Sequence, residues 1–162
     1  MIEPLTRETL WKVASVLVRA RESDRREMWA CHWPDEEVGS IMAGVTASMP
    51  TAYIVHRDAV PSACFGARAV RPGVYAVWAF ATDDWPLVAF PVTKFLKWCM
   101  IPGLHAAGAH RAEALSIADH HAAHRWLEML GARREATLAG FGRDREDFHL
   151  YAWGRDDGAV RR

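Results

Sequence analysis

Three histidines lie close together in the last third of the chain, and imidazole is a common zinc ligand. His120 and His124 are four residues apart, so a helix would place both on one face. A third ligand at a recognisable spacing and the glutamate of an HExxH motif are both missing. We therefore expect no metal, and we interpret His120, His121 and His124 as polar residues at the N-terminus of a helix.

Acidic side chains in two segments have the chemistry for proton transfer. Asp83 and Asp84 follow a predicted strand, where a carboxylate could orient an amine or accept a proton, but both are also favoured turn residues. Asp24 and Glu27 are three residues apart among several arginines, a pattern typical of a solvated, salt-bridged helix face. The turn and the solvated face are the simpler interpretations, and a catalytic role for Asp84 stays open.

The composition indicates one globular domain. The chain has 162 residues, 51% of them hydrophobic, with 20 basic and 20 acidic side chains. The balanced charge gives no long-range field that would attract nucleic acid. The longest apolar runs, such as 13–18, are far shorter than the roughly 20 residues that cross a bilayer, and no signal peptide is recognisable. Because three widely spaced cysteines indicate reduced thiols, we expect a cytoplasmic protein without a membrane span.

The first third of the chain has the periodicity of helices. A short strand at 2–5 precedes a helix that begins at Thr6 and continues to about Ala20, with apolar residues at helical spacing. The segment 23–33 predicts a second helix with Ser23 as its N-cap, and 36–48 a third. These helices come before the main group of strands, an order typical of mixed α/β domains.

The rest of the chain alternates between strand and helix patterns. Strands are predicted at 51–57, 62–70, 74–82, 112–118, 134–141 and 147–153, and helices at about 92–101 and 121–130. The first of these helices is expected to break near Pro102 and Gly103, and the second to stop at Gly131. A helix between the third and fourth of these strands requires one parallel pair. We predict a single α/β (α+β) domain over 1–154 with a mixed, mostly antiparallel sheet, and a flexible tail at 155–162.

The segment LSIADHHAAHRWLEMLGARRE (115–135) resembles the GNAT (Gcn5-related N-acetyltransferase) superfamily. In that family the fifth strand is followed by the pattern NxxAxxxYxxxGF, which Ala123 and Gly131 match. A small residue lets the helix pack closely on the sheet, and glycine supplies the positive φ that ends the helix. His120 stands at the asparagine position and Leu127 at the position of the tyrosine that protonates the departing thiolate. The resemblance covers nearly the whole chain and implies the GNAT fold.

The same resemblance implies an acyl-CoA loop, Q/RxxGxG/A, after the fourth strand. The alignment puts Pro86, Ala89 and Pro91 at the three defined positions, so the loop is degenerate, because proline removes an amide donor. Acetyl-CoA or CoA is the implied cofactor. The residues that the resemblance places at it are Ala81, Thr82, Val88, Ala89, Phe90, Lys94 and His120.

The implied activity is acyl-CoA-dependent transfer to a primary amine, of a small molecule or a protein, or acyl-CoA binding alone. Backbone amides around Ala81 and Thr82 would polarise the thioester carbonyl, and water or Asp84 would take the proton. Ser116 could hydrogen-bond a thiolate or water, and Tyr151 could replace the missing acid. The structural alternatives are a tolerated strand serine and a packed tyrosine.

Short patterns suggest an alternative function. RESDRREMWA (21–30), FATDDW (80–85) and HRWLEMLGA (124–132) look most like degenerate GNAT-like proteins of tailed phages, some classed as an internal virion protein. That resemblance implies a non-catalytic virion or assembly protein, made in the bacterial host cytoplasm, that uses the scaffold to bind virion or assembly proteins. Trp29 and Trp33 would then contact a partner. The two functional hypotheses, enzyme and interaction module, both stay open.

Overall fold

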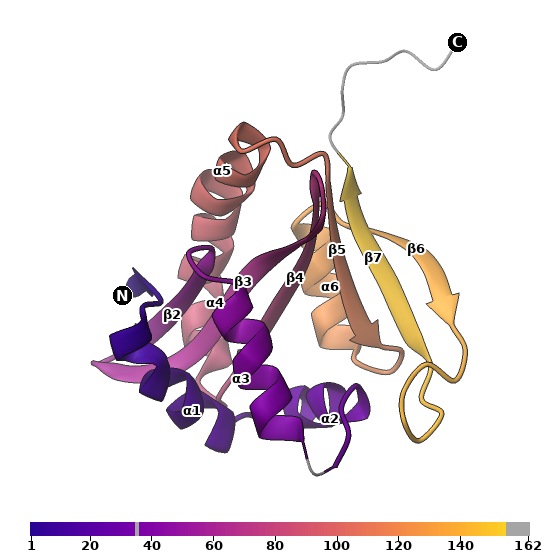
Figure 1. The fold of residues 1–162 in the computed structure, drawn as a ribbon, viewed down its shortest axis with the longest axis horizontal. Coiled ribbons are helices and arrows are strands. Elements are labelled where there is room, and N and C mark those ends of the chain that lie inside the picture. The colour runs from indigo at the N-terminus through magenta and orange to yellow at the C-terminus, as the bar shows by residue number, and fades with distance from the viewer. Residues whose placement is uncertain (35, 155–162) are drawn as a thin grey trace.

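A mixed sheet organises the part of the chain that the structure describes, residues 1–34 and 36–154. In this computed structural model the strand order is β1-β2-β3-β4-β5-β7-β6 (Figure 1). Only β4 and β5 run parallel; every other neighbouring pair is antiparallel. The prediction of a mixed, mostly antiparallel sheet is confirmed, while the predicted tail at 155–162 lies outside the described residues. The strands are β1 (Ile2–Pro4), β2 (Ala52–Arg57), β3 (Val60–Arg71), β4 (Val74–Ala81), β5 (Arg111–Ile117), β6 (Arg133–Leu138) and β7 (Phe148–Gly154).

Helices cover the two faces of the sheet in two groups (Figure 1). One face carries the N-terminal group, which a short 3-10 turn, η1 (Arg7–Thr9), precedes; the other carries the helices that follow β4 and β5. The first group is α1 (Leu10–Val18), α2 (Glu22–Ala30) and α3 (Glu37–Ala47), and the second is α4 (Trp85–Phe95), the π turn η2 (Leu96–Met100), α5 (Ile101–Ala106) and α6 (His121–Met129).

The alternation of strand side chains builds a core on each face. Ile54 and Cys64 pack against residues of α1 and α3, whereas the adjacent Val55 and Phe65 pack against α4, η2 and α5. Successive strand residues point to opposite faces, so strands buried on both sides have nearly continuous apolar sequences. Such apolar runs, bounded by turn residues, predict β2, β3 and β4 close to their observed positions.

The helix after β4 differs from the prediction at both ends. It begins at Trp85 and runs through Pro102 to Ala106 without the expected break. Pro102 lies directly after the π turn, inside this continuous helix. Buried residues recur every four positions, a repeat that rotates about 40° per step on a regular α-helix. The wider π turn compensates for part of this rotation and keeps the buried residues facing the sheet. These residues form the buried stripe of the helix: Val88, Val92, Leu96, Met100 and Leu104.

The start of α2 also differs from the prediction, because Arg21 and not Ser23 is the N-cap residue. The amide of Arg21 donates to the carbonyl of Ala81, at 2.9 Å, and Ala20 forms an isolated antiparallel bridge with Thr82. The chain is thereby fixed to the end of β4 just before α2 begins. This attachment places α2 across the ends of β4 and β5, where the candidate site lies.

Candidate active site

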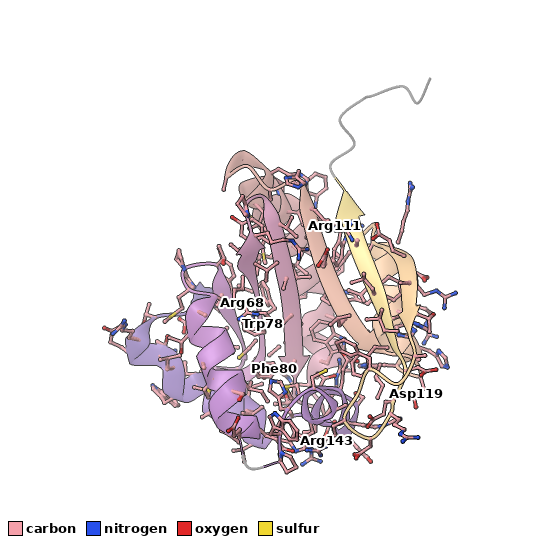
Figure 2. All side chains as sticks on the ribbon, turned by 45° about the vertical axis from the view of Figure 1, so that its right-hand side comes forward. Arg68, Trp78, Phe80, Arg111, Asp119 and Arg143 are labelled. Atoms are coloured by element: carbon pink, nitrogen blue, oxygen red, sulfur yellow. The ribbon has the colours of Figure 1, made fainter. Side chains whose placement is uncertain are left out.

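The two parallel strands diverge and leave a cleft of about 690 Å³. Val74–Ala76 of β4 pairs with Arg111–Glu113 of β5, and beyond these residues the two strands separate. Trp78 and Phe80 lie on β4 beside the gap, and Arg111 lies near the end where the strands pair (Figure 2). Residues of α2 and α3 line the cleft on one face of the sheet, and residues of α4, η2, α5 and α6 line it on the other.

Asp24 of α2 reaches the end of β4. Its Oδ2 accepts a hydrogen bond from the amide of Ala81 at 2.8 Å, and its Oδ1 accepts one from Nε of Arg21, also at 2.8 Å. Asp24 is buried, and burial raises the pKa of its carboxyl, while Arg21 acts in the opposite direction. The interpretation of Asp24 as part of a solvated helix face is therefore wrong.

Glu27, one helical turn after Asp24, reaches the end of β5. A single carboxylate oxygen, Oε2, contacts three donor groups: the Ser116 hydroxyl at 3.0 Å, the Ile117 amide at 3.1 Å and Nδ1 of His120 at 3.0 Å. Because a carboxylate only accepts, Nδ1 of His120 carries the proton of this contact. Glu27, Ser116 and His120 all line the cleft. The interpretation of Glu27 as part of a solvated helix face is also wrong, because its carboxylate makes these three contacts.

The backbone amides at the end of β4 already have acceptors. The amide of Ala81 donates to Asp24, and the amide of Thr82 donates to the carbonyl of Ser62 at 2.9 Å. The expectation that these two amides are free to polarise a carbonyl is corrected accordingly. Alternate amides of a strand point to the same edge. The amide of Ala79 therefore lies on the same edge as that of Ala81, beyond the residues that pair with β5.

Only the short turn 82–84 separates β4 from the helix that follows. The carbonyl of Thr82 accepts from the amide of Trp85, at 3.0 Å, so α4 begins at once and includes the whole segment 86–91. The segment 86–91, expected as a degenerate acyl-CoA loop, is therefore helical, and its role at a cofactor stays a prediction. Val88 belongs to the core, while Phe90 and Lys94 are exposed. The cofactor residues predicted on α4 do not line the cleft: Val88, Ala89, Phe90 and Lys94.

Two of the three predicted catalytic side chains also point elsewhere. Asp84 bonds Nη1 of Arg57 at 2.7 Å and accepts from the Ser62 hydroxyl at 3.3 Å, so it faces β2 and β3. The Tyr151 hydroxyl donates to Glu128 of α6 at 3.2 Å, and burial raises its pKa. Ser116 is the one of the three that lines the cleft.

Two tryptophans connect α4 and α6 at the edge of the cleft. The rings of Trp85 and Trp126 meet nearly perpendicularly with centroids 5.0 Å apart. Trp126 Nε1 donates to the Thr93 hydroxyl at 2.9 Å, and the Arg21 guanidinium lies 5.2 Å from the centre of the Trp85 ring. These contacts restrict the gap between the two helices. Sequence analysis gave Trp126 no role, since its neighbours in the sequence give no sign of a partner on α4.

His124, on the first turn of α6, has structural contacts. His124 Nε2 lies 3.0 Å from the carbonyl of Ile117, which accepts its proton, and burial lowers the pKa of His124. Its ring also packs beside Tyr151. Within residues 1–34 and 36–154, no group of three or more His, Cys, Asp or Glu side chains has the arrangement of a metal site.

Comparisons with known proteins bear on the fold alone. No protein-family model matches the chain, and no curated protein does. The chain is similar to solved structures of acetyltransferases. The ribosomal-protein-S18-alanine N-acetyltransferase from Escherichia coli has 17% identity and a TM-score of 0.67, with 95% of this chain and 92% of that chain covered. The putative acetyltransferase yncA from Salmonella typhimurium, solved with acetyl-CoA, has 13% identity and a TM-score of 0.74, covering 99% and 96%.

A third solved structure is the ribosomal L7/L12 α-N-protein acetyltransferase RimL in complex with CoA. It has 9% identity and a TM-score of 0.69, covering 96% of this chain and 93% of that one. In all three, the similarity extends over nearly the full length of both chains. The predicted fold is confirmed: this chain has the fold of the GNAT N-acetyltransferases.

Proposed function

We propose that this protein is an acyl-CoA-dependent N-acyltransferase that transfers an acetyl group to a primary amine. The observation that carries the proposal is the pair formed by Glu27 and His120 at the end of the cleft between β4 and β5. Two structures with the same fold were solved with acetyl-CoA or CoA, which supports this choice of cofactor. The acceptor proposed here is an amine of a small molecule or a protein.

The cleft fits one part of acyl-CoA better than the other. The edge of β4 between Val77 and Ala79 lies beyond the β4–β5 pairs, and the cleft around it is lined by apolar side chains, which suits an extended acyl-pantetheine arm. The diphosphate end has no glycine loop, because α4 begins at Trp85 and Pro86 in its first turn has no amide donor. We therefore expect weak binding, with the arm contributing most of the affinity. Bound acyl-CoA supplies an activated acyl thioester.

Proton transfer is assigned to the Glu27–His120 pair. Glu27 keeps the His120 proton on Nδ1, so Nε2 can take a proton from the substrate ammonium and leave a neutral amine. The amine then attacks the thioester carbonyl, the new N–C bond replaces the C–S bond, and CoA leaves as the thiolate, which takes up a proton from water. Ser116 donates to the same carboxylate oxygen and thereby holds Glu27 in place. The amide of Ala79 replaces the occupied amides of Ala81 and Thr82 as the donor that polarises the acyl carbonyl.

The first experiment is isothermal titration of the protein with acetyl-CoA and with CoA, followed by acetyl-transfer assays on a panel of primary amines. His120→Gln should lower kcat by about 100-fold, because a positioned general base contributes at least that factor. His121→Gln is the matched control, since His121 is the next residue and does not line the cleft. No saturable heat with folded protein would reject the proposed activity, and equal transfer rates for the two variants would reject His120 as the general base.

A second candidate function is a non-catalytic interaction module. Two contacts limit the room for an acyl-CoA arm in the cleft, which favours a scaffold role. The rings of Trp85 and Trp126 meet at its edge, and the Asp24 carboxylate occupies the Ala81 amide. The assignment to phage virion or assembly proteins stays a prediction, as does location in the bacterial host cytoplasm or virion. Trp33 is 76% exposed, so Trp33→Glu should abolish association with such a partner without unfolding the domain. Normal association of that variant would place the interface elsewhere.

A further inference from the structure

The long helix after β4 exposes large apolar side chains to solvent. Leu87 is 60% exposed, Phe90 73% and Trp98 75%, and none of the three belongs to the buried stripe of this helix. Lys94 and Lys97 lie among them and are also exposed. We call these five residues the outer face of the α4–α5 helix. Singly exposed apolar residues are common, but several aligned along one helix mark an interaction surface.

This helix is also apolar on its inner side. By length and composition alone, Trp85–Ala106 would be suited to cross a membrane. Its inner stripe, however, packs in the core against Val55 and Phe65 of the sheet, so leaving the fold would expose that core. The helix can therefore lie along a membrane surface with its outer face, over a length of about 33 Å for its 22 residues, but it does not insert across one.

The charges of the outer face select its partner. The segment 85–106 contains no Asp or Glu, whereas Lys94 and Lys97 are both cationic, in a chain whose total charge is zero. Lys94 Nζ lies 5.8 Å from the centre of the Phe90 ring, so cation and aromatic are adjacent. Two copies that met by this face would bring four lysines together without a carboxylate on the helix to pair with them. The charge favours an anionic surface over a second copy.

We propose that the outer face of the α4–α5 helix docks on anionic lipid bilayers. Leu87, Phe90 and Trp98 enter the boundary between headgroups and acyl chains, and Lys94 and Lys97 bind lipid phosphates. An indole is suited to this depth because its ring is apolar and its N–H is polar. The inference is independent of the proposed acyltransferase activity, since none of these five residues lines the cleft.

Flotation with vesicles tests the proposal. The protein should float with vesicles of phosphatidylcholine and phosphatidylglycerol, and should not float with phosphatidylcholine alone. Trp98→Ser should weaken partitioning about tenfold, and Lys94→Gln with Lys97→Gln about 30-fold, since each cation near the surface contributes about 1 kcal/mol. Trp33→Ser is the matched control: Trp33 is as exposed as Trp98 but precedes α3. Its partitioning should equal that of the wild type, and circular dichroism should confirm that each variant is folded.

Two cysteines of the same molecule provide a second readout. Cys99 follows Trp98 on the helix, while Cys31 follows α2, and both are exposed. Alkylation followed by peptide mass spectrometry should show that anionic vesicles slow the reaction of Cys99 and leave that of Cys31 unchanged. Each thiol is compared with itself in the absence of vesicles, so their different intrinsic rates do not matter.

Four results would overturn the proposal. These are no flotation with anionic vesicles, equal flotation of the wild type and the Trp98 variant, flotation with neutral vesicles at the same level, and equal slowing of both cysteines. A second copy of the chain is the competing occupant, and light scattering tests for it. A dimer of the wild type that Trp98→Ser dissociates would assign the outer face to a second copy. Retention by an acidic protein column with no vesicle binding would assign it to a protein partner.

Discussion

Asp24 is the residue whose replacement tests the candidate site most directly. Its buried carboxylate accepts from the Ala81 amide and the Arg21 guanidinium, each at 2.8 Å. Asp24→Ala leaves both donors without their acceptor. A hydrogen bond to a charged group contributes about 1.5–3 kcal/mol, so the free energy of unfolding should fall by about 3 kcal/mol. For a chain of this size, that corresponds to a fall in Tm of about 9 °C.

The pH dependence of stability gives an independent check on Asp24. Burial raises its pKa above the ordinary value of 3.8, with Arg21 opposing this shift. Between 3.8 and the higher folded pKa, the folded protein retains a proton that the unfolded chain has released. The stabilising contribution of this carboxyl is therefore present at low pH and is lost as pH rises through the folded pKa. Asp24→Asn removes the titration, so the stability of the wild type relative to this variant should decrease over that interval.

The same substitution has the opposite effect on the proposed cofactor. Asp24→Ala frees the Ala81 amide on the cleft edge of β4 and removes a carboxylate beside it, so acetyl-CoA should bind about tenfold more tightly. Urea denaturation at several pH values and isothermal titration measure the two effects. A stability loss below about 1 kcal/mol would refute the anchoring role of the carboxylate. The expected stability loss with unchanged acetyl-CoA affinity would show that the amide does not face the acyl group.

Two further substitutions test the packing and the limits of the site. Gly66→Ala would put a Cβ 2.7 Å from the Trp78 ring and 3.1 Å from a backbone atom of β2. The free energy of unfolding, measured by denaturation, should therefore fall by about 2 kcal/mol. Gly44→Ala is the control, because nothing lies within 4 Å of its added Cβ, and it should not lower the free energy of unfolding. Tyr151→Phe should cost about 1 kcal/mol of stability, for its lost hydrogen bond, and leave acetyl transfer unchanged, because the hydroxyl points away from the cleft; a kcat loss of tenfold or more would contradict this placement.

The fold was predictable because its signals are local. Short apolar runs bounded by turn residues mark β2, β3 and β4, and Gly131, with a φ of +92°, ends the helix region of α6 as the sequence indicated. The extent of α4 was not predictable in this way, because prolines usually end helices. Pro86 lies in the first turn of α4, where the missing amide donor costs little. Pro91 and Pro102 lie inside the continuous helix, where packing on the sheet overrides the local preference of proline.

Most of the candidate site was not predictable, because its contacts connect distant parts of the chain. Asp24 lies 57 residues from Ala81, and Glu27 lies 93 residues from His120. The surrounding sequence, ESDRRE, has the polarity of a solvated helix, and the burial of Asp24 and the contacts of Glu27 follow only once Arg21 is fixed to β4. His120 and Ser116 were found by resemblance, since the pattern after the fifth strand is a local one.

Two carboxylates of α2, those of Asp24 and Glu27, have opposite consequences for the proposed reaction. Glu27 holds His120 in the tautomer that a general base requires, so it supports acyl transfer. Asp24 occupies the Ala81 amide, which an acyl carbonyl could otherwise use, so it opposes ligand binding while stabilising the end of β4. The balance between enzyme and interaction module therefore depends on Asp24 more than on the degenerate segment 86–91, and removing its carboxylate distinguishes the two.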